Sequence, residues 1–194
     1  MITVGLTGGI GSGKSYISQV FKNLNIPVFN SDVQAKSAYL DSGIQDAVLK
    51  LLGSESFING QANTRFIASK IFNHSSNLAK LNSIIHPWVE KQFRVWTDSL
   101  SVQSYIIKEA AIIFETGIYK KLDYTICVTA PEQIRISRVS LRDGSSEKEI
   151  KKRIMQQWPD EEKIPLADFI IQNDGEQLII PQILKIHQTL INKS

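Results

Sequence analysis

The sequence predicts an α/β fold with a parallel β-sheet, and three observations support this prediction. Five short apolar runs have the length and residue types of buried strands, and helical patterns lie between them. A glycine-rich stretch follows the first run directly. A long helical segment and a shorter, arginine-rich one interrupt the alternation. We therefore expect one domain, residues 1–194, with a core of residues 1–32 and 100–194, a helical insert of residues 33–99 and a helical lid of residues 134–158.

The first strand and the helix after it enclose the glycine-rich stretch. Alternating apolar side chains at Ile2, Val4 and Leu6 predict the strand. Apolar residues recur at helical spacing beyond the stretch and predict a helix with one apolar face: Ile17, Val20, Phe21 and Leu24. Strand, loop and helix in this order form the setting that a phosphate-binding loop requires.

The glycine-rich stretch GLTGGIGSGKSY covers residues 5–16 and fits the spacing G-x-x-x-x-G-K-[ST]. Glycine costs conformational entropy, so a stretch this rich in it needs a geometric reason. A loop of this kind turns its backbone N–H groups inward and, with the N-terminus of the next helix, binds phosphate. Lys14 would reach the outer phosphates of ATP, and the Ser15 hydroxyl would coordinate Mg²⁺. The predicted nucleotide-binding residues of this loop are Gly8, Gly9, Ile10, Gly11, Ser12, Gly13, Lys14, Ser15 and Tyr16.

The second strand is predicted at residues 27–29, and Asp32 follows it closely. Open α/β sheets bind ligands at the edge formed by the C-terminal ends of their strands. A carboxylate at that edge can accept the proton of an attacking hydroxyl group, so Asp32 is a candidate catalytic base. Asp32 is also placed to cap a helix that starts near Val33.

The insert shows apolar residues at helical spacing on both sides of a polar stretch. Residues 54–63 form that polar stretch and predict a loop. The apolar positions are Leu40, Ile44, Val48, Leu51 and Leu52 before it, and Ile67, Ile71, Leu78, Leu81 and Ile85 after it. An insert of this size between core strands is a candidate substrate-binding subdomain.

Residues 105–107, 124–128 and 169–171 predict the remaining strands. The single cysteine, Cys127, lies in the second of these runs. We expect a buried core thiol there, because no partner for nucleophilic catalysis accompanies it.

The stretch IRISRVSLRDGSSEKEIKKRIMQQWP, residues 134–159, predicts a helical hairpin. Arg138 and Arg142 lie four residues apart and share one face of the first helix. Residues 143–145 break that helix, Ser145 or Ser146 can cap the next one, and Arg153 follows on it. A charged hairpin is often only a solvated surface. Downstream of a phosphate-binding loop, we favour a lid whose arginines close over the phosphates.

The bulk properties narrow the class of protein. The chain has 194 residues, 42% of them hydrophobic, and a formal net charge of +3, which suits anionic small molecules and is too weak to indicate nucleic acid. No run approaches the length of uninterrupted apolar sequence that a membrane span needs. The chain enters its first strand without a signal-peptide pattern, so we expect a cytoplasmic protein and a monomer or weak homo-oligomer.

Two large groups of phosphate-loop proteins lack support here. GTPases carry D-x-x-G and N-K-x-D elements, but no aspartate begins the first, and the Asn192-Lys193 pair has no aspartate after it. The L-S-G-G-Q signature of transport ATPases is also missing. A small chain with an acid after its second strand and an arginine lid has the layout of a nucleotide or small-metabolite kinase.

Seven segments occur in an order that resembles the dephospho-CoA kinase family: GLTGGIGSGKS, VFNSDVQAKSA, IIHPWV, AAIIFETGIYKKLD, RVSLRD, RIMQQ and ADFIIQN. The resemblance runs from residue 2 to about residue 190. It implies a P-loop, nucleotide-kinase-like core, a helical subdomain for the coenzyme substrate, and a lid. It also implies that ATP, with Mg²⁺, phosphorylates the ribose 3′-hydroxyl of dephospho-coenzyme A in the last step of coenzyme A biosynthesis.

The resemblance also implies roles for single residues. Lys14, Asp32 and Arg142 would be catalytic, while Arg138 and Arg142 of the lid would bind ATP together with Asn173, close to the adenine. Acceptor binding would fall to Asp32, Arg65, His86, Glu109 and Glu115.

Three of these acceptor residues have structural alternatives. His86 precedes Pro87 in a helical region, Arg65 could form a surface ion pair, and Glu109 either binds Mg²⁺ through water or pairs with a lysine.

Two positions depart from the family pattern. Asn30 stands where the family has the first aspartate of a D-A-D element, which leaves Asp32 as the only acid there. Ala111 stands where the family has a proline. Two alternatives to a dephospho-CoA kinase remain from the sequence: another small-metabolite or nucleoside kinase, and a P-loop protein that binds nucleotide without turning it over.

Overall fold

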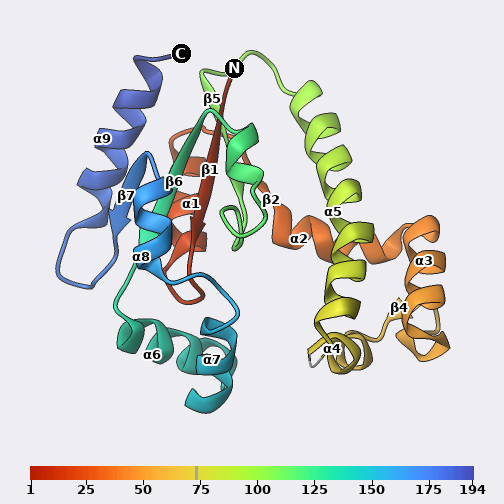
Figure 1. Ribbon diagram of the computed structural model, residues 1–194. Helices are drawn as coiled ribbons and strands as arrows, with labels where there is room; N and C mark the ends of the chain where they lie inside the picture. Colours follow the sequence, from red (N-terminus) through yellow and green to blue (C-terminus); the bar gives the residue numbers. More distant parts are fainter. Residues whose placement is uncertain (73) are drawn as a thin grey trace. The chain divides into compact units, whose positions relative to one another are not determined.

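The computed structural model describes residues 1–72 and 74–194, which form two compact units. Met1–Asn30 and Ser101–Ser194 make up the first unit, and Ser31–Leu100 make up the second. The first unit holds the main sheet, and the second consists mainly of helices (Figure 1). Within the described ranges, no helix combines the length and apolar character needed to cross a membrane.

The first unit confirms the predicted parallel sheet of five strands. In spatial order the strands are β2 (Val28–Asn30), β5 (Tyr105–Glu109), β1 (Ile2–Gly8), β6 (Tyr124–Thr129) and β7 (Phe169–Gln172). All paired strands are parallel, so their C-terminal ends share one edge. Register places Glu109 beside both Leu6 and Asn30 at that edge. The glycine-rich loop therefore starts at the same sheet edge as Glu109 and Asn30.

Two helices pack on one face of this sheet, α1 (Lys14–Asn23) and α9 (Ile179–Ile191) (Figure 1). Ile17 and Phe21 of α1 are fully buried in the shared core, as the predicted apolar face requires. The strand before the loop and the helix after it are thus both anchored in the core, which fixes the two ends of the loop.

The arginine-rich segment forms the predicted pair of helices, α6 (Glu132–Asp143) and α7 (Glu147–Ile154). Gly144 ends α6 in the left-handed conformation, at φ 67°. Ser146 caps α7 in a capping box with Glu149. Between the helices, Ile136, Val139 and Ile150 form a small apolar cluster of their own. A short helix, α8 (Asp160–Lys163), then leads to β7.

The second unit contains the helices predicted for the insert. They are α2 (Ser31–Ser37), α3 (Ser42–Leu52), α4 (Thr64–Phe72) and α5 (Ser75–Asp98). Asp41 caps α3 by accepting the backbone N–H of Ile44 at 3.1 Å, and it also accepts the indole N–H of Trp88. This carboxylate therefore fastens the start of α3 to α5.

The polar loop predicted for residues 54–63 is wrong. A short turn of 3₁₀ helix (Ser54–Ser56) precedes an antiparallel hairpin of β3 (Phe57–Ile58) and β4 (Gln61–Ala62). Asn59 and Gly60 form its turn, both with positive φ (51° and 76°). An Asn-Gly pair favours such a turn, so the signal was present between two very short strands.

The capping role considered for Asp32 is also wrong. Helix α2 begins at Ser31, so Asp32 already lies inside its first turn. An acidic side chain there interacts favourably with the positive end of the helix dipole. Its carboxylate is exposed. The apolar position Leu40 likewise falls outside the core, because it lies in a 3₁₀ turn (Ala38–Leu40) and is 78% exposed.

Candidate active site

The glycine-rich loop lies between β1 and α1, pressed against α6 and against the residues after β7. Gly11 has φ +79°, and a Cβ atom on it would lie 2.5 Å from the Arg135 carbonyl oxygen of α6. Gly13 has φ +102°, and a Cβ atom on it would collide with the side-chain amide of Asn173. Only glycine fits both positions, so the close packing explains the loop's composition.

Lys14 is the first residue of α1, and its ammonium group folds back over the loop. Its Nζ donates to the carbonyl oxygens of Gly8 at 2.8 Å and Gly9 at 3.2 Å. Ser15 and Tyr16, in the same first turn, are exposed. No acidic side chain lies in this turn, so the N-terminus of α1 keeps its attraction for an anion.

Three residues predicted to bind nucleotide meet beside the loop. Arg138 of α6 donates to the backbone and side-chain oxygens of Asn173, both at 3.1 Å. The Asn173 side chain in turn donates to the Ser12 carbonyl oxygen at 2.7 Å. Asn173 is buried and connects the end of the last strand to α6 and to the loop.

Arg142, the second arginine predicted for the lid, is held by its own neighbour. Arg142 binds Asp143 through Nε at 2.7 Å and Nη2 at 2.9 Å, and Arg153 of α7 reaches the same carboxylate at 3.2 Å. The hydrogen bond from Arg142, helped by Arg153, lowers the pKa of Asp143 to about 2. Asp143 therefore holds an arginine of α6 and an arginine of α7 around one carboxylate.

Glu109 lies at the C-terminal end of β5 and is 4% exposed. Its Oε2 accepts two hydrogen bonds, from the Ser18 hydroxyl at 2.8 Å and from the Asn30 side-chain amide at 2.9 Å. The Asn30 amide can donate to this carboxylate, whereas an ionised aspartate at the same position could not. Asn30, which departs from the family pattern, thus has Glu109 as its hydrogen-bond partner.

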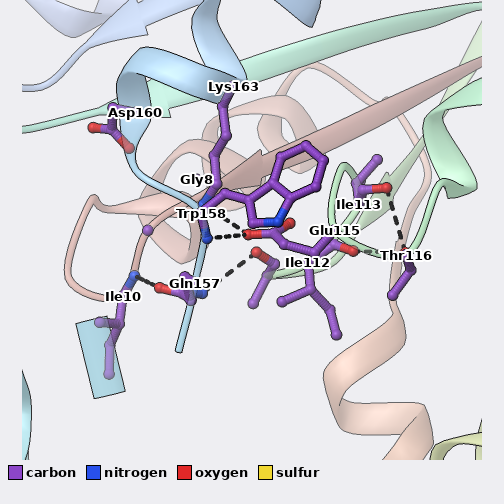
Figure 2. Close-up of polar contacts among 12 residues, drawn as sticks. Gly8, Ile10, Ile112, Ile113, Glu115, Thr116, Gln157, Trp158, Asp160 and Lys163 are labelled. Carbon is purple, nitrogen blue, oxygen red and sulfur yellow. Dashed lines mark hydrogen bonds and ion pairs between the residues drawn. The ribbon is translucent and has the colours of Figure 1, made fainter. Parts of the chain in front are cut away.

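Glu115 is fastened to the segment that follows the lid (Figure 2). Its Oε1 accepts the backbone N–H of Trp158 at 3.0 Å and pairs with the fully buried ammonium group of Lys163, also at 3.0 Å. This places Glu115 beside residues 157–163. Its predicted contact with the acceptor substrate stays a prediction.

The other predicted site residues belong to the second unit. Asp32 is exposed in the first turn of α2, and Arg65 is exposed in the first turn of α4. His86 is half-buried within α5, one residue before Pro87, which lies inside the same helix. Their roles in binding the acceptor stay predictions.

Three residues at the site were not predicted from the sequence: Ser18, Asp143 and Gln157. Ser18 lies on the buried side of α1 and holds Glu109. Gln157 accepts the backbone N–H of Ile10 at 2.8 Å. Asp143 had a local signal, because it directly follows Arg142. The other two depend on contacts that span many residues of sequence, which no local pattern records.

The predicted core thiol is confirmed. Cys127 is fully buried in β6, and burial raises the pKa of its thiol to about 12. The thiolate that nucleophilic catalysis would need is therefore disfavoured.

The family model and the curated relatives point to one family. The family model described as dephospho-CoA kinase matches residues 2–178. The dephospho-CoA kinase of Bacteroides fragilis is 38% identical over 193 residues, which cover 99% of this chain and 94% of the relative. Among solved structures, TT1252 from Thermus thermophilus superimposes with a TM-score of 0.86 at 27% identity, covering 99% of this chain and 97% of that one. Dephospho-CoA kinase from Campylobacter jejuni superimposes with a TM-score of 0.69 at 20% identity, covering 98% of each chain, and shares the fold.

Proposed function

This chain belongs to the dephospho-CoA kinase family, and on that premise we propose that it transfers the γ-phosphoryl group of ATP to the ribose 3′-hydroxyl of dephospho-coenzyme A. The products are coenzyme A and ADP. The observation that carries this proposal is the phosphate-binding loop, with Lys14 at the positive end of α1 and Arg138 and Asn173 beside it.

Phosphoryl transfer depends on positioning and charge neutralisation more than on covalent chemistry. The loop amides and the N-terminus of α1 would bind the phosphates of ATP. Lys14 would exchange its contacts with the Gly8 and Gly9 carbonyl oxygens for phosphate oxygens. Its ammonium group is already directed at the loop, so little rearrangement is needed.

The lid would supply the remaining positive charge. Arg142 presents a planar fork that now grips Asp143 in two places. The same fork matches two phosphate oxygens. A phosphate group can therefore replace the Asp143 carboxylate as the partner of the Arg142 guanidinium group. Arg138 would bind ATP while it stays bound to Asn173, which would lie close to the adenine.

The first unit also has residues that suit a magnesium ion. Mg²⁺ usually takes few protein ligands and completes its shell with phosphate and water. Accordingly, no cluster of three or more His, Cys, Asp or Glu side chains in the described ranges forms a metal site of its own. The exposed Ser15 hydroxyl would hold the ion directly, and the Glu109 carboxylate, at the same sheet edge, would hold one of its waters. When bound, the ion neutralises charge on the β- and γ-phosphates.

Asp32 would accept the proton of the attacking 3′-hydroxyl. As an exposed carboxylate in the first turn of α2, it is available for this role. The second unit, with Arg65 and His86, would bind the rest of the acceptor. A cytoplasmic location and a monomeric or weakly oligomeric state also stay predictions.

An assay of ADP release with dephospho-coenzyme A, adenosine and shikimate in parallel tests the proposal. We expect turnover with dephospho-coenzyme A alone. Turnover with either other acceptor would favour another small-metabolite or nucleoside kinase. ATP binding without turnover of any acceptor would favour a non-catalytic nucleotide-binding protein.

Two variants test the assigned roles in the same assay. Lys14→Ala should abolish transfer and leave the melting temperature nearly unchanged, because the side chain is only half-buried. Asp32→Asn should lower kcat by roughly 10² or more, the usual loss for a general base, with little change in the KM for ATP. A normal kcat in Asp32→Asn would show that Asp32 is not the base.

A further inference from the structure

Ile10 lies in the middle of the phosphate-binding loop, and two parts of the lid hold it. Its side chain packs against the apolar cluster of Ile136, Val139 and Ile150, which joins the two lid helices. Its backbone N–H group donates to the Gln157 side-chain oxygen at 2.8 Å (Figure 2). Gln157 lies three residues beyond the end of α7, on the segment by which the chain leaves the lid.

Gln157 is itself fixed in place from two directions (Figure 2). Its Nε2 donates to the Ala111 carbonyl oxygen at 3.4 Å, just after β5. The next residue, Trp158, donates its backbone N–H to Glu115, and that carboxylate is paired with the buried Lys163. The amide of Gln157 therefore links the lid exit to both the phosphate-binding loop and the end of the central sheet.

The first lid helix also touches the loop. The Arg135 backbone packs against Gly11, and its guanidinium group packs against Gly9. The loop is thus bordered by both ends of the lid, by α6 through Arg135 and by the exit segment through Gln157. A change in the position of the lid cannot leave Ile10 unaffected, because its side chain and its N–H group are both bound to lid residues.

We infer that Gln157 is a positioning residue that couples the position of the lid to the shape of the phosphate-binding loop through Ile10. The Gln157 side-chain oxygen accepts the Ile10 N–H group, so this N–H group stays directed at the lid. The neighbouring N–H groups of the loop remain available for the phosphates. ATP would bind to a loop that the lid has already shaped. This inference rests on the proposed ATP-dependent transfer.

The first test compares two adjacent glutamines. Gln157→Met keeps the length of the side chain but cannot accept the Ile10 N–H bond. It should raise the KM for ATP between about threefold and tenfold, the range for one lost hydrogen bond. The KM for dephospho-coenzyme A, measured at saturating ATP, should change less than twofold. Gln156→Met is the matched control, because Gln156 is exposed on the same segment, and it should leave both constants unchanged. Equal constants in wild type and Gln157→Met would overturn the inference, as would an equal rise of both constants.

A second variant keeps the test decisive if Gln157→Met folds poorly. Gln157→Glu still accepts the Ile10 N–H bond but cannot donate to Ala111. At high ionic strength, where the added negative charge is screened, its KM for ATP should stay within about threefold of wild type under the same conditions, because the contact to the loop carries the effect. A KM raised more than threefold in Gln157→Glu at high ionic strength would instead assign the effect to the Ala111 contact and would contradict the coupling through Ile10.

A double-mutant cycle tests the coupling itself. Ile10→Ala removes the side chain from the lid cluster, and Gln157→Met removes the N–H acceptor. If both act through the position of Ile10, the double variant should raise the KM for ATP no more than the worse single variant. Additive effects on the free energy of ATP binding would show that the two contacts are independent.

Trp158 supplies a readout that does not require turnover. Its indole ring is partly exposed, and its backbone follows Gln157 directly. Adding MgATP or inorganic tripolyphosphate should change the tryptophan emission in wild type and Gln156→Met. The change should be lost in Gln157→Met, and a Trp158→Phe variant identifies the part that comes from this residue. An unchanged response in Gln157→Met would refute the coupling. A chain that shows this response but phosphorylates no acceptor would contradict only the proposed function.

Discussion

At the scale of single residues, Asn30 shows how a change in one side chain depends on another far away in sequence. Asn30 and Glu109 lie side by side on paired strands, and the Asn30 amide donates to Glu109 at 2.9 Å. The sequence alone presents Asn30 as a departure that removes a charge. In the fold, the amide stabilises a buried carboxylate that a second carboxylate would repel.

We expect Asn30→Asp to destabilise the protein by about 1–3 kcal/mol, because it removes a hydrogen bond to a buried charged group and adds a like charge. The double variant Asn30→Asp with Glu109→Gln restores one donor and one acceptor, so it should recover most of that loss. Urea unfolding of Asn30→Asp, Glu109→Gln and the double variant measures the loss in the free energy of unfolding for each. If the two single losses simply add in the double variant, the contact between residues 30 and 109 does not govern stability.

Asp143 is a second residue whose importance lies in its partners. We expect Asp143→Asn to lower the KM for ATP two- to fivefold at low ionic strength, because it removes a negative charge that competes with phosphate for Arg142 and Arg153. The effect should shrink at high salt. Glu147→Gln is the matched control, since that exposed lid acid pairs with Lys151 instead.

The pH dependence of this effect follows from the lowered pKa of Asp143. A carboxyl group with a pKa of about 2 is fully ionised at every pH above about 4. The ratio of KM values between Asp143→Asn and wild type should therefore stay constant from about pH 6 to about pH 9. If the ratio changes between these two pH values, another titrating group controls Arg142 and Arg153.

At the scale of elements, the sequence predicts those whose signals are local. Helices α6 and α7 were predictable because α6 carries its arginines at helical spacing and α7 begins with a capping box. The hairpin at residues 57–62 was missed because strands of two residues have no measurable alternation. The segment 157–163 carries no local signal of its contacts. Its partners, Ile10 and Glu115, lie more than forty residues away, and the fold alone brings them together.

The buried ion pair of this segment allows an element-scale prediction. Lys163→Met leaves the Glu115 carboxylate in a largely buried site without its cation, which should cost about 3–5 kcal/mol. Adding Glu115→Gln removes the charge and keeps an acceptor for the Trp158 N–H group, so the double variant should regain most of the stability. Chemical denaturation provides the measurement.

The same double variant separates the two roles considered for Glu115. If Glu115 only anchors residues 157–163, regained stability should come with a normal KM for dephospho-coenzyme A. If it also binds the acceptor, stability should return while that KM stays raised. A double variant as unstable as Lys163→Met would show that the pair does not act as a unit.

At the scale of the whole molecule, the sequence predicts the parallel sheet and the helical nature of the insert. Apolar strands and helical spacing are dictated by burial alone, so they are visible in any single sequence. The order of the strands cannot be read from a single sequence, because β1 lies between β5 and β6, both distant from it in the chain. The chain passes between the two units twice, after Asn30 and after Leu100. The second unit therefore begins at Ser31, and Asp32 follows Asn30, the last residue of the sheet edge in β2, by two residues in the sequence.

The last prediction concerns the two units and their separate ligands. ATP would bind the first unit, whereas dephospho-coenzyme A would be bound largely by the second, through Arg65. Each ligand at about 100 times its dissociation constant should raise the melting temperature by roughly 5–10 °C. Arg65→Ala should lose more than half of the shift given by dephospho-coenzyme A, because one charge-assisted contact contributes about 1.5–3 kcal/mol. The shift given by MgATP should remain complete.

Arg94→Ala provides the matched control, because Arg94 is another exposed arginine of the second unit. It should leave both shifts unchanged. Lys14→Ala should show the opposite pattern to Arg65→Ala, with the MgATP shift reduced and the dephospho-coenzyme A shift retained. If Arg65→Ala weakens both shifts equally, or only the MgATP shift, the helical insert is not the acceptor-binding part of the molecule. The binding of dephospho-coenzyme A must then be sought on the first unit, around Glu109 and Glu115.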